Sequence, residues 1–335
     1  MLAMSLRRKQ NFSGLFSGWF LCSLILCLSV SSLHAQATPS NLAGSPEIAD
    51  QVLAKLGKQE IRWSDLAYRW RVGGAKVPGL SKVESIVVVE GVESARKQRI
   101  GQAELDRRGV GATVQEINQW IEERIAAIEG EKLTPSDLAE KEGLSLSSWT
   151  RELRWQKSWE KFSRPLVTDD KLKLHYEEHP TWFNGTECEV FHIIRPLKWD
   201  DENGRRKATS EFAILADQIR NKETTFEDAA KKWSSGATAS EGGRLGWLTF
   251  QGPMHPSFVQ ATFALKKGEV SEPVETPHGV HLIYVHDVKA GELPFERVIE
   301  DVRRSLLIVE FEKLVDSYPK PPQLEWIYKL DNANK

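Results

Sequence analysis

Apolar residues recur at helical spacing through most of the chain between residues 64 and 179. The clearest stripe follows Thr113-Val-Gln-Glu116, in which the threonine and the glutamate have the spacing of a capping box at a helix start. The members of this stripe are Val114, Ile117, Trp120, Ile121, Ile125 and Ile128. Ahead of it, Val52–Ile61 has the pattern of two short strands that turn at Gly57. The first part of the chain is therefore predicted to be mainly helical.

The hydrophobic pattern changes after Pro180. Glu187–Ile194 alternates like a strand, and Lys198–Lys207 is expected to be a polar loop. The elements expected next are helices at Ser210–Arg220, Thr225–Trp233 and Phe258–Leu265, a glycine-rich strand start at Gly242–Trp247, and strands at Val270–Glu275 and Val280–Asp287. This order of strands and helices predicts a compact α+β domain.

One long helix is expected at Leu293–Tyr318, where Val298, Val302 and Leu306 fall at helical spacing. An apolar stripe on a lone helix needs a partner surface. Because the α+β domain looks complete without this helix, we expect it to return to the N-terminal helices. The mixed domain is then an insertion in a helical one.

The N-terminus has the three parts of a secretory signal peptide. Arg7, Arg8 and Lys9 form a positive start, Leu15–Val30 is apolar, and Ala35-Gln36-Ala37 resembles a cleavage site. The apolar stretch is shorter than the roughly 20 residues of a membrane span. We therefore expect residues 1–37 to be a cleaved signal and residues 38–48 a flexible lead-in. An uncleaved membrane anchor is the alternative, and no membrane span is expected after cleavage.

Composition narrows the classes of function. The chain has 335 residues and a formal net charge of −2, so it lacks the basic excess of nucleic-acid-binding proteins and no nucleic-acid partner is expected. Signal cleavage would leave Cys188 as the only cysteine, which excludes an internal disulfide. Cys188 lies four residues from His192 on the expected strand, or about 13 Å, which is too far for a nucleophile and its base.

A series of motifs in residues 187–289 resembles the parvulin family of peptidyl-prolyl isomerases. These motifs are Glu189-Val-Phe-His192-Ile-Ile, Phe226-Glu-Asp-Ala-Ala-Lys-Lys-Trp-Ser234, Gly242-Gly-Arg-Leu-Gly-Trp247, Phe263-Ala-Leu-Lys-Lys-Gly-Glu-Val-Ser271 and Thr276-Pro-His-Gly-Val-His281. The flanking segments are similar to exported foldases of the SurA/PrsA type. The resemblance implies a parvulin domain at 181–290 with a four-stranded antiparallel sheet and helices. It also implies a helical chaperone-like domain formed by 49–180 and 291–335.

The family's activity implies roles for particular residues. Rotation about a prolyl amide meets a resonance barrier of about 18–20 kcal/mol, and no bond is made or broken. A catalyst needs an apolar slot that grips proline and polar groups that favour the twisted amide. By resemblance, Leu245, Met254 and Phe258 form the slot, and His192 and His281 form a hydrogen-bonded pair on adjacent strands. The expected partners are unfolded or proline-containing polypeptides in the periplasm, and no cofactor is expected.

Three departures from the parvulin pattern concern the activity. Gly236 stands where the family usually has Cys or Asp, and Ser235 or His278 are the candidates to supply the missing polar group. Arg244 replaces the usual acid of the glycine-rich motif. A client-binding chaperone with a weak or inactive parvulin domain is therefore the alternative function.

Two other patterns are given non-catalytic interpretations. His175-Tyr-Glu-Glu178-His179 matches the H-x-x-E-H pattern of zinc proteases, with Glu178 as the possible base. Pro180 ends the helix at once and no third ligand is evident, so no metal site is predicted. The cations between Arg195 and Lys207 are interrupted by acids, which favours a solvated loop over a phosphate site.

Overall fold

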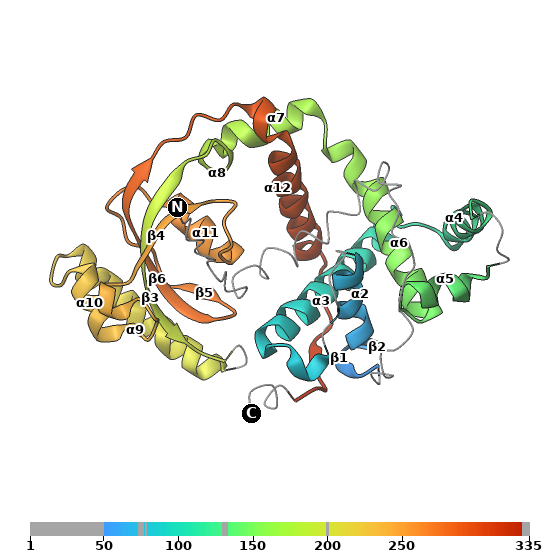
Figure 1. Cartoon of the computed structure of the whole chain (residues 1–335), viewed down its shortest axis with the longest axis horizontal. Coiled ribbons are helices and arrows are strands. Elements are labelled where there is room, and N and C mark those ends of the chain that lie inside the picture. The colour runs from blue at the N-terminus through green and yellow to red at the C-terminus, as the bar shows by residue number, and fades with distance from the viewer. Residues whose placement is uncertain (1–49, 73–76, 78, 129–132, 199–200, 330–335) are drawn as a thin grey trace, which may run out of the picture.

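The computed structural model describes residues 50–72, 77, 79–128, 133–198 and 201–329. In Figure 1 the long helix α12 (Phe295–Asp316) stands between a helical part of the chain and a part built on a β-sheet. The expected signal segment and lead-in lie outside the described residues. Each helix within the described ranges is too short or too polar to cross a membrane.

The part of the chain before the sheet is mainly helical, as its hydrophobic pattern predicts. Its elements are β1 (Val52–Leu56), β2 (Gln59–Arg62), α2 (Trp63–Val72), η3 (Leu80–Lys82), α3 (Ser85–Arg107), α4 (Val114–Ala126), α5 (Pro135–Lys141), α6 (Leu146–Ser163), η4 (Arg164–Leu166), α7 (Asp169–Glu178) and α8 (Pro180–Phe183). The capping box of α4 is present, since Thr113 Oγ1 accepts from the Glu116 N–H and the Glu116 carboxylate accepts from the Thr113 N–H. This reciprocal pair satisfies two of the amide donors that a helix start leaves open.

A small sheet joins the two ends of the described chain. The predicted hairpin of β1 and β2 is present, and β7 (Leu324–Trp326) adds to the other side of β1 in an antiparallel register with Ala54 opposite Trp326. The sequence pattern does not predict β7, because three residues are too few to show the alternation of a strand.

Helix α12 packs against α3, α6 and α7. Its Phe311 lies edge-on to Trp155 and Trp159 of α6, at ring-centroid distances of 5.6 and 5.7 Å. Glu312 pairs with Lys97 of α3 at 2.7 Å. Aromatic edge-to-face contacts add about 0.5–1.5 kcal/mol each beyond the burial of area. The C-terminal helix thus completes the core of the helical part.

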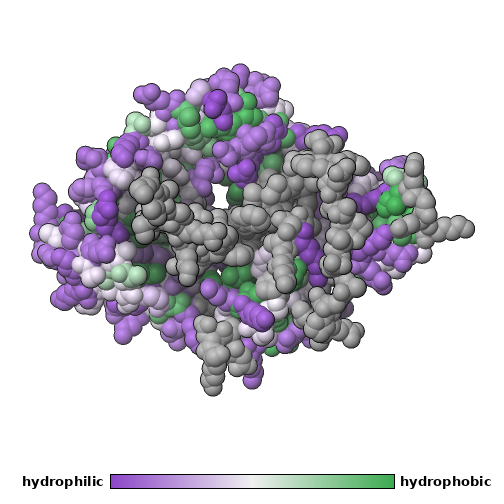
Figure 2. Space-filling view, in the orientation of Figure 1, coloured by the Kyte–Doolittle hydropathy of each residue, from purple (hydrophilic) through white to green (hydrophobic). Residues whose placement is uncertain are grey.

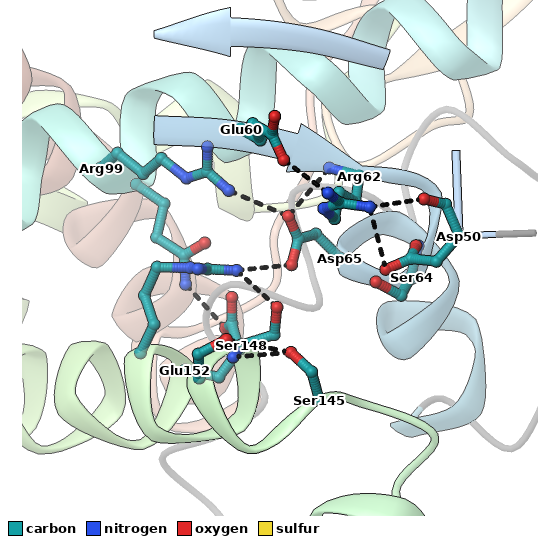
Figure 3. A network of polar contacts seen from close by, with 12 residues as sticks. Asp50, Glu60, Arg62, Ser64, Asp65, Arg99, Ser145, Ser148 and Glu152 are labelled. Carbon is teal, nitrogen blue, oxygen red and sulfur yellow. Dashed lines mark hydrogen bonds and ion pairs between the residues drawn. The ribbon is translucent and has the colours of Figure 1, made fainter. Parts of the chain in front are cut away.

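A buried polar network fixes α2 against α3 and α6 (Figure 3). The Asp65 carboxylate, 4% exposed, accepts from Arg99 at 2.9 Å and from Arg151 at 2.6 Å. Glu152 accepts from Gln98 at 2.8 Å beside it, and burial raises its pKa. A buried carboxylate is tolerated only when such partners surround it, so the network fixes how these helices meet.

The second sheet has four antiparallel strands in the order β4-β3-β6-β5, which confirms the predicted α+β class and the parvulin-like sheet. Its elements are β3 (Glu187–Pro196), α9 (Glu202–Arg220), α10 (Phe226–Trp233), η5 (Ala239–Glu241), β4 (Arg244–Thr249), α11 (Pro256–Ala264), β5 (Val274–Thr276) and β6 (Gly279–Lys289). Helices α9 and α10 pack on the face that carries Phe191 and Ile193. Helix α11 packs on the opposite face, which carries Val190 and Ile283.

The expected polar loop at Lys198–Lys207 is wrong in its second half. Helix α9 already begins at Glu202, capped by Asp201, whose side chain accepts from the Gly204 N–H at 2.9 Å. Arg205, expected to be solvated, is only 9% exposed and donates to the carbonyl oxygens of Thr276 and Pro277. The alternating charges between Arg195 and Lys207 could not predict this role, because the two carbonyl oxygens belong to a turn about 70 residues later in the chain.

Candidate active site

Two histidines lie on the central strands of the second sheet, on the face that α11 covers. His192 is on β3 and His281 is on β6, where it pairs with Ile194. His192 is 9% exposed and His281 is 4% exposed, and the centroids of their two rings are 5.7 Å apart. The period of two along each strand points both side chains to the same face. Strand pairing thus brings together the two histidines that the sequence predicts as a hydrogen-bonded pair. The described residues show no hydrogen bond between the two rings, because His281 Nε2 pairs with Thr276 Oγ1 instead.

Phe258 of α11 faces both imidazoles. Its ring is edge-on to His192 at 6.1 Å and to His281 at 5.4 Å, and the residue is 1% exposed. Leu245 of β4 and Met254, just before α11, are half-buried and pack on the same apolar cluster. The three predicted slot residues therefore line one apolar site, with Phe258 at its buried end beside the histidines.

The histidine pair is neutral at physiological pH. Burial lowers the pKa of His192 to about 4. Burial lowers the pKa of His281 to about 3, and the charge of His192 contributes. The Nδ1 atoms of both rings are buried without a hydrogen-bond partner among the described residues. An unpartnered buried polar atom costs about 1–3 kcal/mol. Other buried side chains of the described residues share this property, among them the indole N–H groups of Trp63, Trp149 and Trp159, so the Nδ1 atoms alone do not identify a functional site.

Thr276 orients one of the two rings, and sequence analysis did not assign it a role. Its Oγ1 is 2.9 Å from His281 Nε2 and accepts from the His278 N–H at 3.1 Å. Thr276 is 4% exposed, and Arg205 donates to its carbonyl oxygen at 2.8 Å. The available signal is a hydroxyl residue at the end of β5, directly before the turn that leads into the strand of His281.

The position of the missing Cys or Asp lies beside His192. A Cβ atom built on Gly236 would be 3.5 Å from His192 Nε2, but only 2.6 Å from Ile194 Cγ2. Ile194 thus occupies the space that a side chain at 236 would need. Ser235, one candidate substitute, is exposed, and its N–H donates to the Ile194 carbonyl at 2.8 Å. The described residues show no hydrogen bond between Ser235 and either histidine.

His278, the other candidate, lies in the turn between β5 and β6 and is exposed at the surface. Its charge nevertheless contributes to the lowered pKa of His281. A further histidine, His255, directly precedes α11 and is half-buried, and no sequence motif points to it. Burial lowers the pKa of His255 to about 4, and the charges of His278 and Lys97 lower it further. His278 and His255 therefore extend the polar edge of the site.

The glycine-rich segment before β4 positions His192. Gly243 has φ +85°, and a Cβ atom there would lie 2.3 Å from the His192 carbonyl oxygen. Its own carbonyl accepts from the His192 N–H at 2.8 Å. Arg244, which replaces the usual acid, pairs with Glu189 of β3 at 2.7 Å. The changed charge thus has a cross-strand partner.

Cys188 has the surroundings of a structural residue. It is 2% exposed, and burial raises the pKa of its thiol to about 11. A thiol needs a lowered pKa and access to act as a nucleophile. Cys188 therefore supplies packing on the α11 face of the sheet.

Known proteins resemble this chain over the same region. The family model described as rotamase, PPIC-type PPIase domain, matches residues 192–287. The peptidyl-prolyl cis-trans isomerase ESS1 of Saccharomyces cerevisiae is 34% identical over 167 residues, which cover 44% of this chain and 97% of the yeast protein.

Chaperone and foldase proteins also match, over smaller shares of their length. Chaperone SurA of Ralstonia nicotianae is 44% identical over 147 residues, which cover 44% of this chain but 27% of that protein. Foldase protein PrsA of Bacillus subtilis is 50% identical over 93 residues, or 25% of this chain and 31% of that protein. The crystal structure of PrsA from Bacillus anthracis aligns with a TM-score of 0.36 at 20% identity, over 66% of this chain and 94% of that one.

Proposed function

The chain belongs to the parvulin, or PPIC-type, family of peptidyl-prolyl isomerases, and we propose that it is an exported, periplasmic foldase that isomerises prolyl bonds in unfolded clients. The observation that supports this function is the apolar cluster of Leu245, Met254 and Phe258 beside two neutral, buried histidines, which we assign as the proline-binding slot. The SurA and PrsA relatives are named as a chaperone and a foldase.

The slot and the histidines act on different parts of the substrate. Phe258 and Met254 bind the proline ring and exclude water, which weakens the resonance-stabilised planar amide relative to the less polar twisted one. His192 and His281 stay uncharged at neutral pH. They can therefore orient the substrate amide and form hydrogen bonds to it, but they do not place a positive charge beside it. Thr276 holds the His281 ring in place. Rotation then needs no proton transfer to the substrate.

Two charged residues of the helical part act electrostatically on histidines at the edge of the proposed slot. The charge of Lys97 acts on His255, and that of Glu84, which precedes α3, acts on His278. A client held by the helical part is therefore near the isomerase site. This proximity supports a combined chaperone and isomerase.

Exposed apolar side chains supply contacts for unfolded clients. Figure 2 shows hydrophobic residues gathered where α7 meets the start of α12. Leu174 of α7 is 54% exposed, and Leu293, just before α12, is 46% exposed. Val114 and Leu146, at the starts of α4 and α6, are 71% and 43% exposed. Such side chains fit extended apolar segments of client chains.

We assign residues 181–290 to a parvulin unit inserted into a helical unit made of 49–180 and 291–335. The two connections between the units lie next to each other, since the Leu293 N–H donates to the Asn184 carbonyl at 2.8 Å and the Gly291 N–H donates to Thr186 Oγ1 at 3.2 Å. Limited proteolysis near 180–186 and 288–294 is expected to release a folded parvulin fragment. Rapid degradation of the whole region instead would contradict the insertion.

A second function is favoured by one observation. Gly236 leaves no side chain beside His192, and Ile194 fills the space. The slot can still bind proline-containing segments, so the chain would then act as a client-binding chaperone without useful catalysis.

Isomerisation of short Xaa-Pro peptides by residues 38–335 separates the two functions. We expect acceleration that Met254→Ala reduces at least tenfold. Leu265→Ala is the matched control, because Leu265 is also half-buried on the same cluster but lies outside the proposed slot. Peptide binding without acceleration would establish the chaperone function, and neither binding nor acceleration would refute both.

A further inference from the structure

Three side chains with metal-binding chemistry meet at the C-terminal end of α7, outside the isomerase site. They are His175, Glu178 and His179, and their ligand atoms all lie within 4.8 Å of one another. Residues three and four positions apart share one face of a helix. The sequence pattern alone predicts no metal site here, because Pro180 ends the helix and no third ligand is evident, but the structure places the Glu178 carboxylate with the two imidazoles.

The end of α7 is held in place by aromatic stacking. Pro180 starts α8 directly after His179, so the chain turns here without a loop. The His179 ring stacks on Trp182 with a centroid distance of 3.9 Å and an interplanar angle of 10°. Trp182 in turn stacks on Phe250 with a centroid distance of 4.3 Å and an interplanar angle of 10°. A ligand whose ring is fixed before binding loses little conformational entropy when the ion binds.

The His175 ring is fixed by a different contact. His175 is 5% exposed, and its Nε2 lies 3.0 Å from Ser305 Oγ on α12. A metal-binding histidine usually makes such a hydrogen bond through its second ring nitrogen, which sets the tautomer and the ring orientation. Nδ1 is then the ring nitrogen available to an ion.

We propose that His175, Glu178 and His179 bind one divalent transition-metal ion, with Zn²⁺ the best match to this donor set. Two imidazoles and one carboxylate are typical zinc ligands, whereas Ca²⁺ and Mg²⁺ prefer oxygen donors alone. Three protein ligands leave a coordination position open to water or to a client side chain. The nearby cation Lys313 is paired with Glu310 at 2.9 Å, which reduces its repulsion of an ion.

A bound ion would join the segments that meet at this point. Its ligands lie at the end of α7, the His179 stack involves α8, and Ser305 belongs to α12. Because α8 leads into β3, the site lies at one of the two connections to the parvulin part. Zn²⁺ binding is therefore expected to stabilise the folded chain against local opening at this junction.

The site can be tested by Zn²⁺ titration. Tag-free protein (residues 38–335) is first stripped of metal, and Zn²⁺ is then added while a chromophoric chelator competes with the protein for the ion. We expect one Zn²⁺ per chain. His179→Phe keeps an aromatic ring to stack on Trp182 but removes a ligand, and Glu178→Gln removes the exposed carboxylate with little change of shape. We expect affinity losses of at least about 100-fold and about 10-fold respectively, and about 10-fold for Ser305→Ala.

The matched control is His286→Phe, the same substitution at an exposed histidine of β6 that contacts Phe191 and Tyr284. It should bind Zn²⁺ like the wild type. Added Zn²⁺ should raise the melting temperature of wild type and of this control, but not that of His179→Phe. Absence of wild-type binding below about 100 μM Zn²⁺ would refute the proposal and leave the cluster a packing feature. Equal binding by His179→Phe would also refute it.

Discussion

Gly236 gives the sharpest test of how the isomerase site is built. Its backbone φ is not in the left-handed region, so alanine is conformationally acceptable there. At such a position Gly→Ala usually stabilises a protein by about 0.4–1 kcal/mol, because it restricts the unfolded chain. Here the new Cβ would lie 2.6 Å from Ile194 Cγ2. Overpacking of this kind typically costs about 1–3 kcal/mol, so we expect Gly236→Ala to destabilise by about 1–2 kcal/mol.

A double-mutant cycle with Ile194→Ala isolates this contact. Ile194 is half-buried, so its truncation is expected to cost about 1–3 kcal/mol, less than for a fully buried isoleucine. The truncation also removes the clashing Cγ2 atom. Gly236→Ala should therefore become neutral or stabilising in the Ile194→Ala background, a coupling of about 1–2 kcal/mol. The assay is the free energy of unfolding from urea denaturation of all four proteins. A stabilising Gly236→Ala in the wild-type background, or strict additivity, would refute the reasoning.

The same background tests whether the missing side chain limits catalysis. With Ile194 truncated, Gly236→Asp places a carboxylate beside His192. We expect its kcat/KM for a prolyl peptide to exceed that of Ile194→Ala by about tenfold, or about 1.4 kcal/mol of transition-state stabilisation. Gly236→Ala in that background is the control for shape without charge. No gain over this control would show that the neutral site does not need the family's polar residue.

Three further predictions concern stability, each measured by urea denaturation. The pKa values of His192 and His281 are lower in the folded state than in the unfolded chain, so the unfolded chain binds more protons. The free energy of unfolding should therefore stay constant above about pH 6.5 and fall as the pH drops toward 4, by about 2 kcal/mol at pH 5 for His192 alone. Equal stability at pH 7 and pH 5 would contradict the burial of these rings. Phe311→Ala should destabilise by about 3–5 kcal/mol, since Phe311 is 4% exposed between two tryptophans; a loss under 1 kcal/mol would exclude the packing of α12 described above. Asp65→Asn should cost about 3–5 kcal/mol, because it leaves the buried Arg99 without its anion, whereas exposed Asp170→Asn should be nearly neutral.

Most of the fold follows from local patterns in the sequence. The capping box at Thr113, the stripe after it, and the alternation at Glu187–Ile194 each reflect a periodicity that one element imposes on its own residues. The elements that were missed depend on distant partners. Strand β7 pairs with the open edge of β1. The start of α9 combines a local cap by Asp201 with the bonds of Arg205 to carbonyl oxygens of Thr276 and Pro277.

The site divides in the same way. The family motifs predict that His192, His281 and the proposed slot residues lie near one another, and the structure places them so, while their roles in binding and catalysis stay predictions. Thr276 and His255 could not be predicted, since their roles arise from a hairpin turn and from the position of α11 over the sheet. The space beside Gly236 is also a tertiary property, because Ile194 approaches it from a neighbouring strand.

The aromatic contacts connect the isomerase slot with the proposed metal site. His179 stacks on Trp182, Trp182 on Phe250, and Phe250 lies edge-on to Phe263 of α11 at 5.4 Å. Phe250 belongs to the segment between β4 and α11 that also carries Met254, a wall of the slot. We expect from this contact chain that an ion that fixes His179 also restrains the segment carrying Met254. Peptide affinity of wild type and His179→Phe, measured with and without Zn²⁺, tests this coupling, and equal responses of the two proteins would refute it. An ion at the end of α7 would therefore reduce the motion of the slot without touching the substrate, which makes client affinity, rather than the intrinsic rotation step, the property that Zn²⁺ should change.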